Sequence, residues 1–174
     1  LGPATNTKET LTELASSGVN VFRINFSHAD YEDVKKRVKQ IREINHENGY
    51  NVAVLADLQG PKLRVGVMEE GIMLKDGDEF IFTTEECVGN NEKAYMTYQN
   101  FPRDVKPGEQ ILVDDGKLLF EVISTDKKLK VVTKVIVGGV LSSKKGVNLP
   151  NTNISLPALT EKDKKDAIFA LSLD

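Results

Sequence analysis

The chain is organised around one stretch, Val21-Phe22-Arg23-Ile24-Asn25-Phe26-Ser27-His28. Its residues alternate between two faces as far as Phe26, which predicts a β-strand with one apolar face. Arg23 and Asn25 share the opposite face, near the carboxyl end of the predicted strand. A buried guanidinium is seldom kept without a partner, so an arginine on this face indicates a site for an anion.

The residues after this strand, Ser27, His28 and Asp30, predict the start of a helix. Turns between a parallel strand and the next helix gather ligand-binding groups, because unpaired N–H groups of the helix point outward there. A simpler interpretation is that Arg23 only reaches solvent and that Ser27 only caps the helix. The stretch taken alone leaves both interpretations open.

The composition is typical of a soluble globular protein, with 174 residues of which 40% are hydrophobic and 28% charged. The 23 basic and 26 acidic residues are dispersed and leave a net charge of −3, which argues against binding to nucleic acid or to a membrane surface. Cys87 is the only cysteine, which excludes an intramolecular disulfide and, with two histidines, the usual zinc sites. No apolar run approaches the roughly 20 residues that span a bilayer. We therefore expect a cytoplasmic protein.

Two amphipathic helices are expected on either side of the first strand. Thr7 is the expected N-cap of the first helix, and Gly18 its C-terminal stop. The second helix is expected from about Asp30 to Asn48-Gly49. Its apolar stripe consists of Val34, Val38, Ile41 and Ile44.

A second strand is predicted for residues 51–58, an almost uninterrupted apolar run that ends in Asp57. Such a run is typical of a strand buried on both faces of a parallel sheet. The order of helix, strand, helix and strand is a β/α repeat. By alternation, Asp57 stands at the carboxyl end of its strand beside Arg23 and Asn25 of the neighbouring strand. The three polar side chains of Arg23, Asn25 and Asp57 are therefore expected to lie together at the carboxyl end of the two strands, which would form the mouth of a site.

The pattern changes to β between residue 63 and about residue 149. Short β-rich runs alternate there with turn-forming residues, and no helical period is present. The runs are 80–84, 94–98, 110–113, 118–124 and 129–137. Asp114-Asp115-Gly116 predicts a hairpin turn. We interpret this region as a small β-barrel or sandwich inserted into an α/β frame.

The α/β pattern returns after residue 156. Thr160 is the expected N-cap of a helix with Glu161 and Asp163 in its first turn. The chain begins at Leu1 rather than at a methionine and reaches Asp174 without a helix-ending signal. We therefore expect both ends to be cut from a longer protein.

Six stretches resemble the pyruvate kinase family, in the order and with the spacing of that family. They are Leu1-Gly2-Pro3-Ala4-Thr5, Phe22-Arg23-Ile24-Asn25-Phe26-Ser27-His28, Asp57-Leu58-Gln59-Gly60-Pro61-Lys62-Leu63-Arg64, Val113-Asp114-Asp115-Gly116, Lys145-Gly146-Val147-Asn148-Leu149-Pro150 and Leu156-Pro157-Ala158-Leu159-Thr160-Glu161-Lys162-Asp163. The resemblance implies a partial (β/α)₈ TIM barrel that is interrupted by an inserted all-β, barrel-like lid domain. The implied segments are 1–64 for the start of the barrel, 65–150 for the lid and 151–174 for the return to the barrel.

The activity implied by the resemblance is transfer of the phosphoryl group of phosphoenolpyruvate to ADP, giving pyruvate and ATP. Arg23 would bind the phosphate of phosphoenolpyruvate. Phosphoryl transfer needs positive groups held in place more than it needs covalent chemistry. The nucleotide-binding residues would be Asn25, His28, Arg64 and Lys145, with Asp115 in the lid. The oxygen ligands of a monovalent cation would come from Asn25, Ser27, Asp57 and the backbone of Leu58.

The resemblance also places essential parts of the family's site beyond Asp174, namely the catalytic lysine and the ligands of Mg²⁺. A barrel of about 250 residues cannot close with two strands, so we expect the chain alone to be inactive. The parent enzyme implied by the resemblance is a homotetramer. The cut barrel edges are expected to make this chain self-associate.

Two positions depart from the commonest family pattern, with Leu58 in place of a threonine and Lys62 in place of a glutamate. A glutamate would add negative charge beside Asp57, which K⁺ would balance. The ammonium of Lys62 and a K⁺ ion would instead repel each other by about 4 kcal/mol at a separation of roughly 4 Å and an effective dielectric constant near 20. We therefore expect K⁺ to be dispensable, unless Lys62 is a solvated loop lysine.

Two other functions are alternatives to the one that this resemblance implies. The first is a non-catalytic β binding module with α/β flanks. The second is another barrel enzyme that acts on phosphoenolpyruvate or pyruvate, which would not explain the β insertion. A further strand soon after Asp174, with a Lys-x-Glu at a later strand end, would separate the kinase from the binding module.

Overall fold

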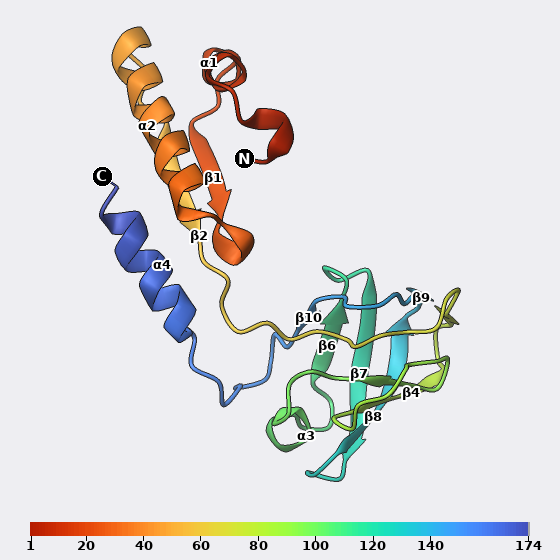
Figure 1. Ribbon diagram of the computed structural model, residues 1–174. Helices are drawn as coiled ribbons and strands as arrows, with labels where there is room; N and C mark the ends of the chain where they lie inside the picture. The colour runs from red at the N-terminus through yellow and green to blue at the C-terminus, as the bar shows by residue number, and fades with distance from the viewer. Residues whose placement is uncertain (174) are drawn as a thin grey trace. The chain divides into compact units, whose positions relative to one another are not determined.

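The computed structural model describes residues 1–173, which form two compact units (Figure 1). The α/β unit contains Leu1–Pro61 and the segment that begins at Pro157, whereas the β unit contains Lys62–Leu156. The chain therefore leaves the α/β unit once, builds the β unit and returns. Asp174, the last residue of the third segment predicted from the sequence, lies outside the described residues.

The α/β unit is built on two parallel strands joined by a helix. β1 (Val21–Asn25) pairs with β2 (Ala53–Asp57). α2 (Tyr31–Asn48) forms the crossover that neighbouring parallel strands require. The other helical elements are η1 (Pro3–Thr5), α1 (Lys8–Ser16), η2 (Phe26–His28) and α4 (Glu161–Leu171). The predicted β/α repeat is therefore confirmed.

The bounds of α2 follow from its capping residues. The side chain of Asp30 accepts hydrogen bonds from the backbone N–H groups of Glu32 and Asp33, and Gly49 ends the helix with a left-handed φ of 70°. The predicted apolar stripe is buried and packs with Phe22 and Ile24, on the apolar face of β1. One face of the strand pair is thus closed by helix packing.

The other face of the strand pair is bare, so the prediction of a second strand buried on both faces is wrong. Leu55 of β2 is 52% exposed and Val21 of β1 is 50% exposed. Val54 and Ala56, which point to the other side of β2, pack into the helix-covered core. Leu55 and Val21 are exposed because, among the described residues, helices pack on only one face of this sheet.

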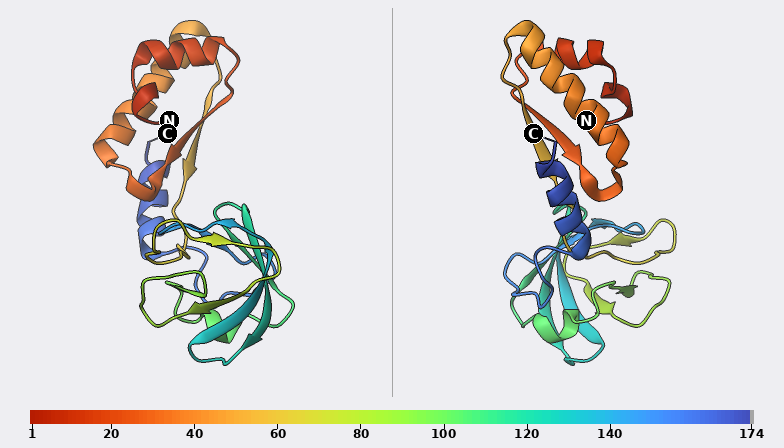
Figure 2. Two further views of the ribbon diagram at one scale, coloured as in Figure 1. Left: turned by 90° about the vertical axis from the view of Figure 1, so that its right-hand side faces the viewer. Right: turned by 60° about the vertical axis from the view of Figure 1, so that its left-hand side comes forward.

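The β unit contains a six-stranded sheet in the order β10-β6-β7-β8-β4-β5. Its neighbours are antiparallel except for β4 and β5. The sheet curls around its core, as Figure 2 shows. The fold class predicted from the sequence, a partial α/β barrel with an inserted all-β domain, is confirmed.

Five strands of the β unit (β4 to β8) match the predicted runs except at their ends, and the two-residue strands β3, β9 and β10 were not predicted. The strands are β3 (Met73–Leu74), β4 (Glu79–Thr83), β5 (Lys93–Tyr95), β6 (Gln110–Val113), β7 (Leu118–Thr125), β8 (Lys130–Val137), β9 (Gly139–Val140) and β10 (Val147–Asn148). The two short strands β3 and β9 form a separate pair. The predicted hairpin turn joins β6 to β7, and positive φ angles at Asp114, Asp115 and Gly116 make it tight.

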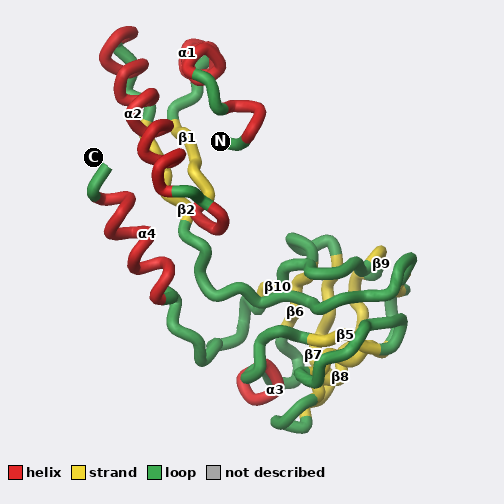
Figure 3. The backbone as a smooth tube through the Cα atoms, viewed as in Figure 1, coloured by secondary structure: helices red, strands yellow, loops and turns green. Residues whose placement is uncertain are grey.

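One short helix interrupts the β unit, although the sequence predicted none there (Figure 3). α3 (Phe101–Asp104) is a single turn with Pro102 at its start. Four residues are too few to show a helical period, so no pattern could reveal this turn. It carries Phe101 into the core, where the side chain is fully buried.

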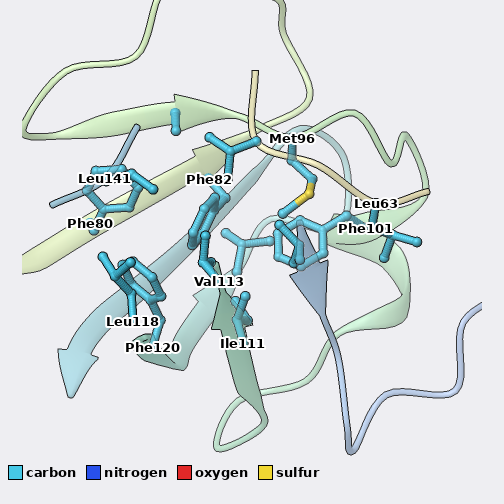
Figure 4. Close-up of a cluster of buried hydrophobic side chains, with 14 of the residues drawn as sticks. Leu63, Phe80, Phe82, Met96, Phe101, Ile111, Val113, Leu118, Phe120 and Leu141 are labelled. Carbon is cyan, nitrogen blue, oxygen red and sulfur yellow. The ribbon is translucent and has the colours of Figure 1, made fainter. Parts of the chain in front are cut away.

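The core of the β unit is centred on four phenylalanines (Figure 4). Phe80 and Phe82 come from β4, Phe120 from β7 and Phe101 from α3, and each is fully buried. Neighbouring rings lie 5.1 to 6.0 Å apart between centroids, mostly edge to face. Burial of one such side chain contributes about 1.5 to 3 kcal/mol, so this cluster is a large part of the unit's stability.

The segments that enter and leave the β unit are paired with each other. The backbone N–H of Val65 donates to the carbonyl of Lys145 at 2.9 Å, and the N–H of Val147 donates to the carbonyl of Leu63 at 2.9 Å. The two ends of the unit therefore lie side by side.

We expect amide hydrogen exchange to be slower in the β unit than in the α/β unit. β7 and β8 are paired on both sides over a closed core, whereas β1 and β2 each keep an unpaired edge and a bare face. Exchange followed by mass spectrometry should leave peptides from β7 and β8 protected longest. Slower exchange in peptides from β1 and β2 would contradict this expectation.

Candidate functional site

The carboxyl ends of β1 and β2 bring together the three polar residues that the alternation predicted. The guanidinium of Arg23 donates to the carboxylate of Asp57. The strand register places Asn25 directly opposite Asp57. The mouth expected from the sequence is therefore formed by the pairing of these two strands.

Arg23 is exposed rather than buried, which corrects the expectation drawn from its strand. Its side chain is 58% exposed and that of Asp57 is 37% exposed, because this face of the sheet is bare. A guanidinium carries five N–H donors, and Asp57 is its only acidic partner among the described residues. Asp57 thus orients Arg23 while other donors remain available to a planar or tetrahedral anion.

The turn after β1 is the short helix η2 and not the first turn of α2. The side-chain oxygen of Asn25 accepts from the backbone N–H of Ser27 at 2.8 Å and caps η2. His28 is the last residue of η2, and Asp30 is the N-cap of α2. The interpretation of Ser27 as the cap of the long helix is therefore wrong.

The oxygen atoms expected to bind a monovalent cation are of a suitable chemical type. They are the side-chain oxygens of Asn25, Ser27 and Asp57 and the backbone carbonyl of Leu58, all neutral or carboxylate oxygens that suit hard cations. Asn25 already accepts one hydrogen bond, and an amide oxygen has a second lone pair. No cluster of three or more acidic, histidine or cysteine side chains that could hold a metal exists among residues 1–173.

The first turn of α4 contacts the loops that follow β1 and β2. The ammonium of Lys162 donates to the carbonyl of Phe26 at 2.7 Å. The carboxylate of Asp163 accepts from the N–H of Gly60 at 3.0 Å. The sequence predicted the cap at Thr160 and the acidic first turn with Glu161 and Asp163, which the structure confirms, but not these contacts with the loops.

A polar cluster around the buried carboxylate of Asp166 supports these contacts of α4. Asp166 is 2% exposed, and its carboxylate accepts from the Tyr31 hydroxyl at 2.7 Å and pairs with Lys162 at 2.5 Å. The ring of Tyr31 stacks on Phe169, with 3.9 Å between centroids. Sequence reasoning missed these residues, and the one available signal was a second aspartate three positions after Asp163.

In the β unit, the predicted nucleotide-binding residues Arg64 and Lys145 lie on adjacent paired segments. The guanidinium of Arg64 donates to the carbonyl of Lys144 at 2.8 Å. The ammonium of Lys145 pairs with Asp114 at 3.1 Å, and Lys117 pairs with the same carboxylate at 3.0 Å. Hydrogen bonds from the two ammonium groups hold the pKa of Asp114 below its usual value, and the bond from Lys117 has the larger effect. Asp114 therefore orients Lys145, a role that its place in a hairpin turn did not reveal.

Three further residues singled out in the sequence have few polar contacts. Asp115 is exposed in the β6–β7 turn. Leu58 is half-buried against the helix-covered core of the α/β unit. Lys62 is half-buried at the start of the β unit and makes no ion pair within residues 1–173. Asn25 and His28 belong to the α/β unit, and Arg64 and Lys145 to the β unit.

Comparison with known proteins gives one family along the whole chain. The family model "Pyruvate kinase, barrel domain" matches residues 1–174. The pyruvate kinase of Geobacillus stearothermophilus is 42% identical over 173 residues, which cover 98% of this chain and 30% of that protein. The pyruvate kinase of Corynebacterium glutamicum is 40% identical over 174 residues, which cover 99% of this chain and 36% of that protein.

A solved structure has the same fold as this chain. A crystal structure of a pyruvate kinase from Cryptosporidium parvum matches with a TM-score of 0.81 and 32% identity, over 97% of this chain and 34% of that chain. The chain thus spans about a third of the length of the relatives it matches. Within residues 1–173 there is no helix with the length and apolar character needed to cross a membrane.

We expect Asp114 to titrate below the ordinary aspartate pKa of about 3.9. Its ion pairs stabilise the fold fully above that ordinary value, and this contribution is lost as the pH falls through the lowered pKa. Carboxyl ¹³C NMR should show that Lys117→Met and Lys145→Met each raise the pKa of Asp114. Lys134→Met, at an exposed position of β8, is the control. An unchanged pKa in both test variants would show that the ion pairs do not form in solution.

Proposed function

Because the chain belongs to the pyruvate kinase family, we propose that it is part of an enzyme that transfers the phosphoryl group of phosphoenolpyruvate to ADP. The products are pyruvate and ATP, in glycolysis. The observation that carries this proposal is the exposed guanidinium of Arg23, oriented by Asp57 at the carboxyl end of two parallel strands. Ligands of α/β barrels bind at this end of the strands.

The proposed role of Arg23 is to bind the phosphate of phosphoenolpyruvate. Charge is spread over several oxygens of the transferred group, so catalysis depends on fixed positive groups near them. The ion pair with Asp57 restricts the guanidinium before substrate binds, which lowers the entropy lost on binding. Its remaining N–H groups would donate to phosphate oxygens.

The nucleotide is proposed to bind through Asn25, His28, Arg64 and Lys145. Arg64 and Lys145 are each held by a contact within the β unit, to the carbonyl of Lys144 and to the carboxylate of Asp114. Such restraint suits residues that bind phosphates, because less side-chain entropy is lost on binding. Asp115, in the same turn as Asp114, is proposed to belong to a lid.

The proposed cofactor is Mg²⁺, which when bound neutralises charge on the transferring phosphates. Its ligands are proposed to lie outside this chain. The oxygens of Asn25, Ser27, Asp57 and Leu58 would hold a monovalent cation, and we propose that the ammonium of Lys62 supplies that charge instead. The support is the presence of a lysine five positions after Asp57 that makes no ion pair among the described residues.

We propose that the chain alone is inactive, since the catalytic lysine and Mg²⁺ ligands are proposed to lie elsewhere. The segments 1–64, 65–150 and 151–174 are proposed as barrel, lid and barrel. The bare sheet face with Leu55 and Val21 supports self-association of the isolated chain. The complete enzyme is proposed to be a cytoplasmic homotetramer.

In the full-length protein, Arg23→Ala should lower kcat/KM for phosphoenolpyruvate. The lost charge-assisted contact corresponds to about 2 to 4 kcal/mol of transition-state stabilisation. Arg23→Lys should recover only part of the rate, because an ammonium cannot reproduce two-pronged binding. Arg42→Ala, at an exposed position of α2, is the matched control. Steady-state assays that give an unchanged kcat/KM for Arg23→Ala would remove Arg23 from the site.

We expect the full-length enzyme to turn over without K⁺ while still requiring Mg²⁺. The measurement is activity in a tetramethylammonium buffer with and without KCl. Lys62→Met should then become dependent on added K⁺, because the tethered charge is lost. Strong activation of the unaltered enzyme by K⁺ would contradict the proposal that Lys62 replaces K⁺.

A further inference from the structure

Two neighbouring side chains at the start of α4 bind the backbones of both loops that form the candidate site. The Lys162 ammonium donates to the carbonyl of Phe26, which lies between Asn25 and Ser27. The Asp163 carboxylate accepts from the N–H of Gly60, three residues after Asp57. These contacts join positions 136 and 103 residues apart in the chain.

The contact from Asp163 to Gly60 goes beyond what helix capping requires. One carboxylate oxygen of Asp163 accepts from the N–H and hydroxyl of Thr160, at 2.8 and 2.6 Å, and this completes the cap. The other oxygen accepts from Gly60. Asp163 is fully buried, and a buried carboxylate is tolerated only when its oxygens are hydrogen-bonded. Bonds from the Thr160 side chain and backbone and from Gly60 hold the pKa of Asp163 below its usual value, against burial, which raises it.

Lys162 is itself held in place by a buried acid. Asp166 pairs with the ammonium and also accepts from the Tyr31 hydroxyl. The side chain of Lys162 is 45% exposed, and its ammonium is nevertheless held between the carboxylate of Asp166 and the carbonyl of Phe26. Since this carbonyl belongs to η2, the position of the η2 turn is tied to α4.

We propose that Lys162 and Asp163 are positioning residues that set the geometry of the phosphate-binding site by fixing the η2 turn and the loop after β2. This inference rests on the proposed function. Lys162 and Asp163 contact backbone atoms of the two loops. They therefore affect the position of the loops and not the chemistry of the loop side chains. Phosphoryl transfer is sensitive to such displacements, and a shift of about 1 Å can cost about 100-fold in rate.

The test is steady-state kinetics of the full-length protein carrying Asp163→Asn or Lys162→Met. We expect KM for phosphoenolpyruvate to rise at least about tenfold in each, because the displaced loops no longer hold the phosphate-binding groups in place. KM does not depend on the fraction of protein that is folded. If the two residues only stabilise the fold, the substitutions should therefore lower total activity and leave KM unchanged. Lys162→Arg should restore most of the affinity, because it keeps a cationic donor.

Matched controls come from the same turn of α4. Glu161→Gln and Lys164→Met alter an ion pair of 2.6 Å whose side chains are 83% and 57% exposed and which touches neither loop. Both controls should keep KM within about twofold, since exposed pairs contribute little. Hydrogen exchange of the peptide over residues 58–61 should be faster in Asp163→Asn and unchanged in Glu161→Gln.

The outcomes separate this inference from the proposed function. If the unaltered full-length protein fails to turn over phosphoenolpyruvate, the proposed function falls and the inference falls with it. If the unaltered protein is active but Asp163→Asn and Lys162→Met keep their KM, the residues are only structural and the inference alone is overturned. Should Asp163→Asn fail to fold, the pair Lys162→Met and Lys162→Arg decides the question.

Discussion

The parallel pairing of β1 and β2 is the constraint on which the candidate site depends. Parallel strands end at the same edge of a sheet, and the observed register sets Asn25 opposite Asp57. The buried stripe of α2 and the apolar face of β1 hold that register, because a slip by one residue would turn Arg23 towards the helices. The helix packing on one face therefore determines which side chains are presented on the other.

Elements with short-range signals could be predicted from the sequence alone. Asp30 and Gly49 bound α2 because capping needs only local geometry, and alternation assigned the faces of β1 correctly. The burial of β2 could not be predicted in the same way. An apolar residue such as Leu55 does not show whether a second layer covers its side of the sheet, and the pattern within a single strand does not show it either. The single turn of α3 could not be predicted either, because four residues are too few for a helical period to repeat.

The contacts of the candidate site also differ in whether the sequence could predict them. The convergence of Arg23, Asn25 and Asp57 follows from alternation in two strands plus the rule that parallel strands share an edge. The pairing of Lys145 with Asp114 and the contact of Asp163 with Gly60 do not follow from any spacing. In the second case the partner is a backbone N–H, which nearly every residue type provides, so the sequence at Gly60 carries no mark of it.

The paired ends of the β unit have a consequence for how this chain tolerates change. Since Leu63 and Val147 are joined by a backbone hydrogen bond, the whole β unit behaves thermodynamically as one closed loop within the α/β unit. The entropy of closing such a loop grows slowly, by only about 0.6 kcal/mol for each doubling of its length. A longer flexible loop within the β unit would therefore add little to the entropy cost of closing the insertion. The backbone hydrogen bonds at the junction keep the two chain ends that the α/β unit supplies close together, whatever the length of the loops between them.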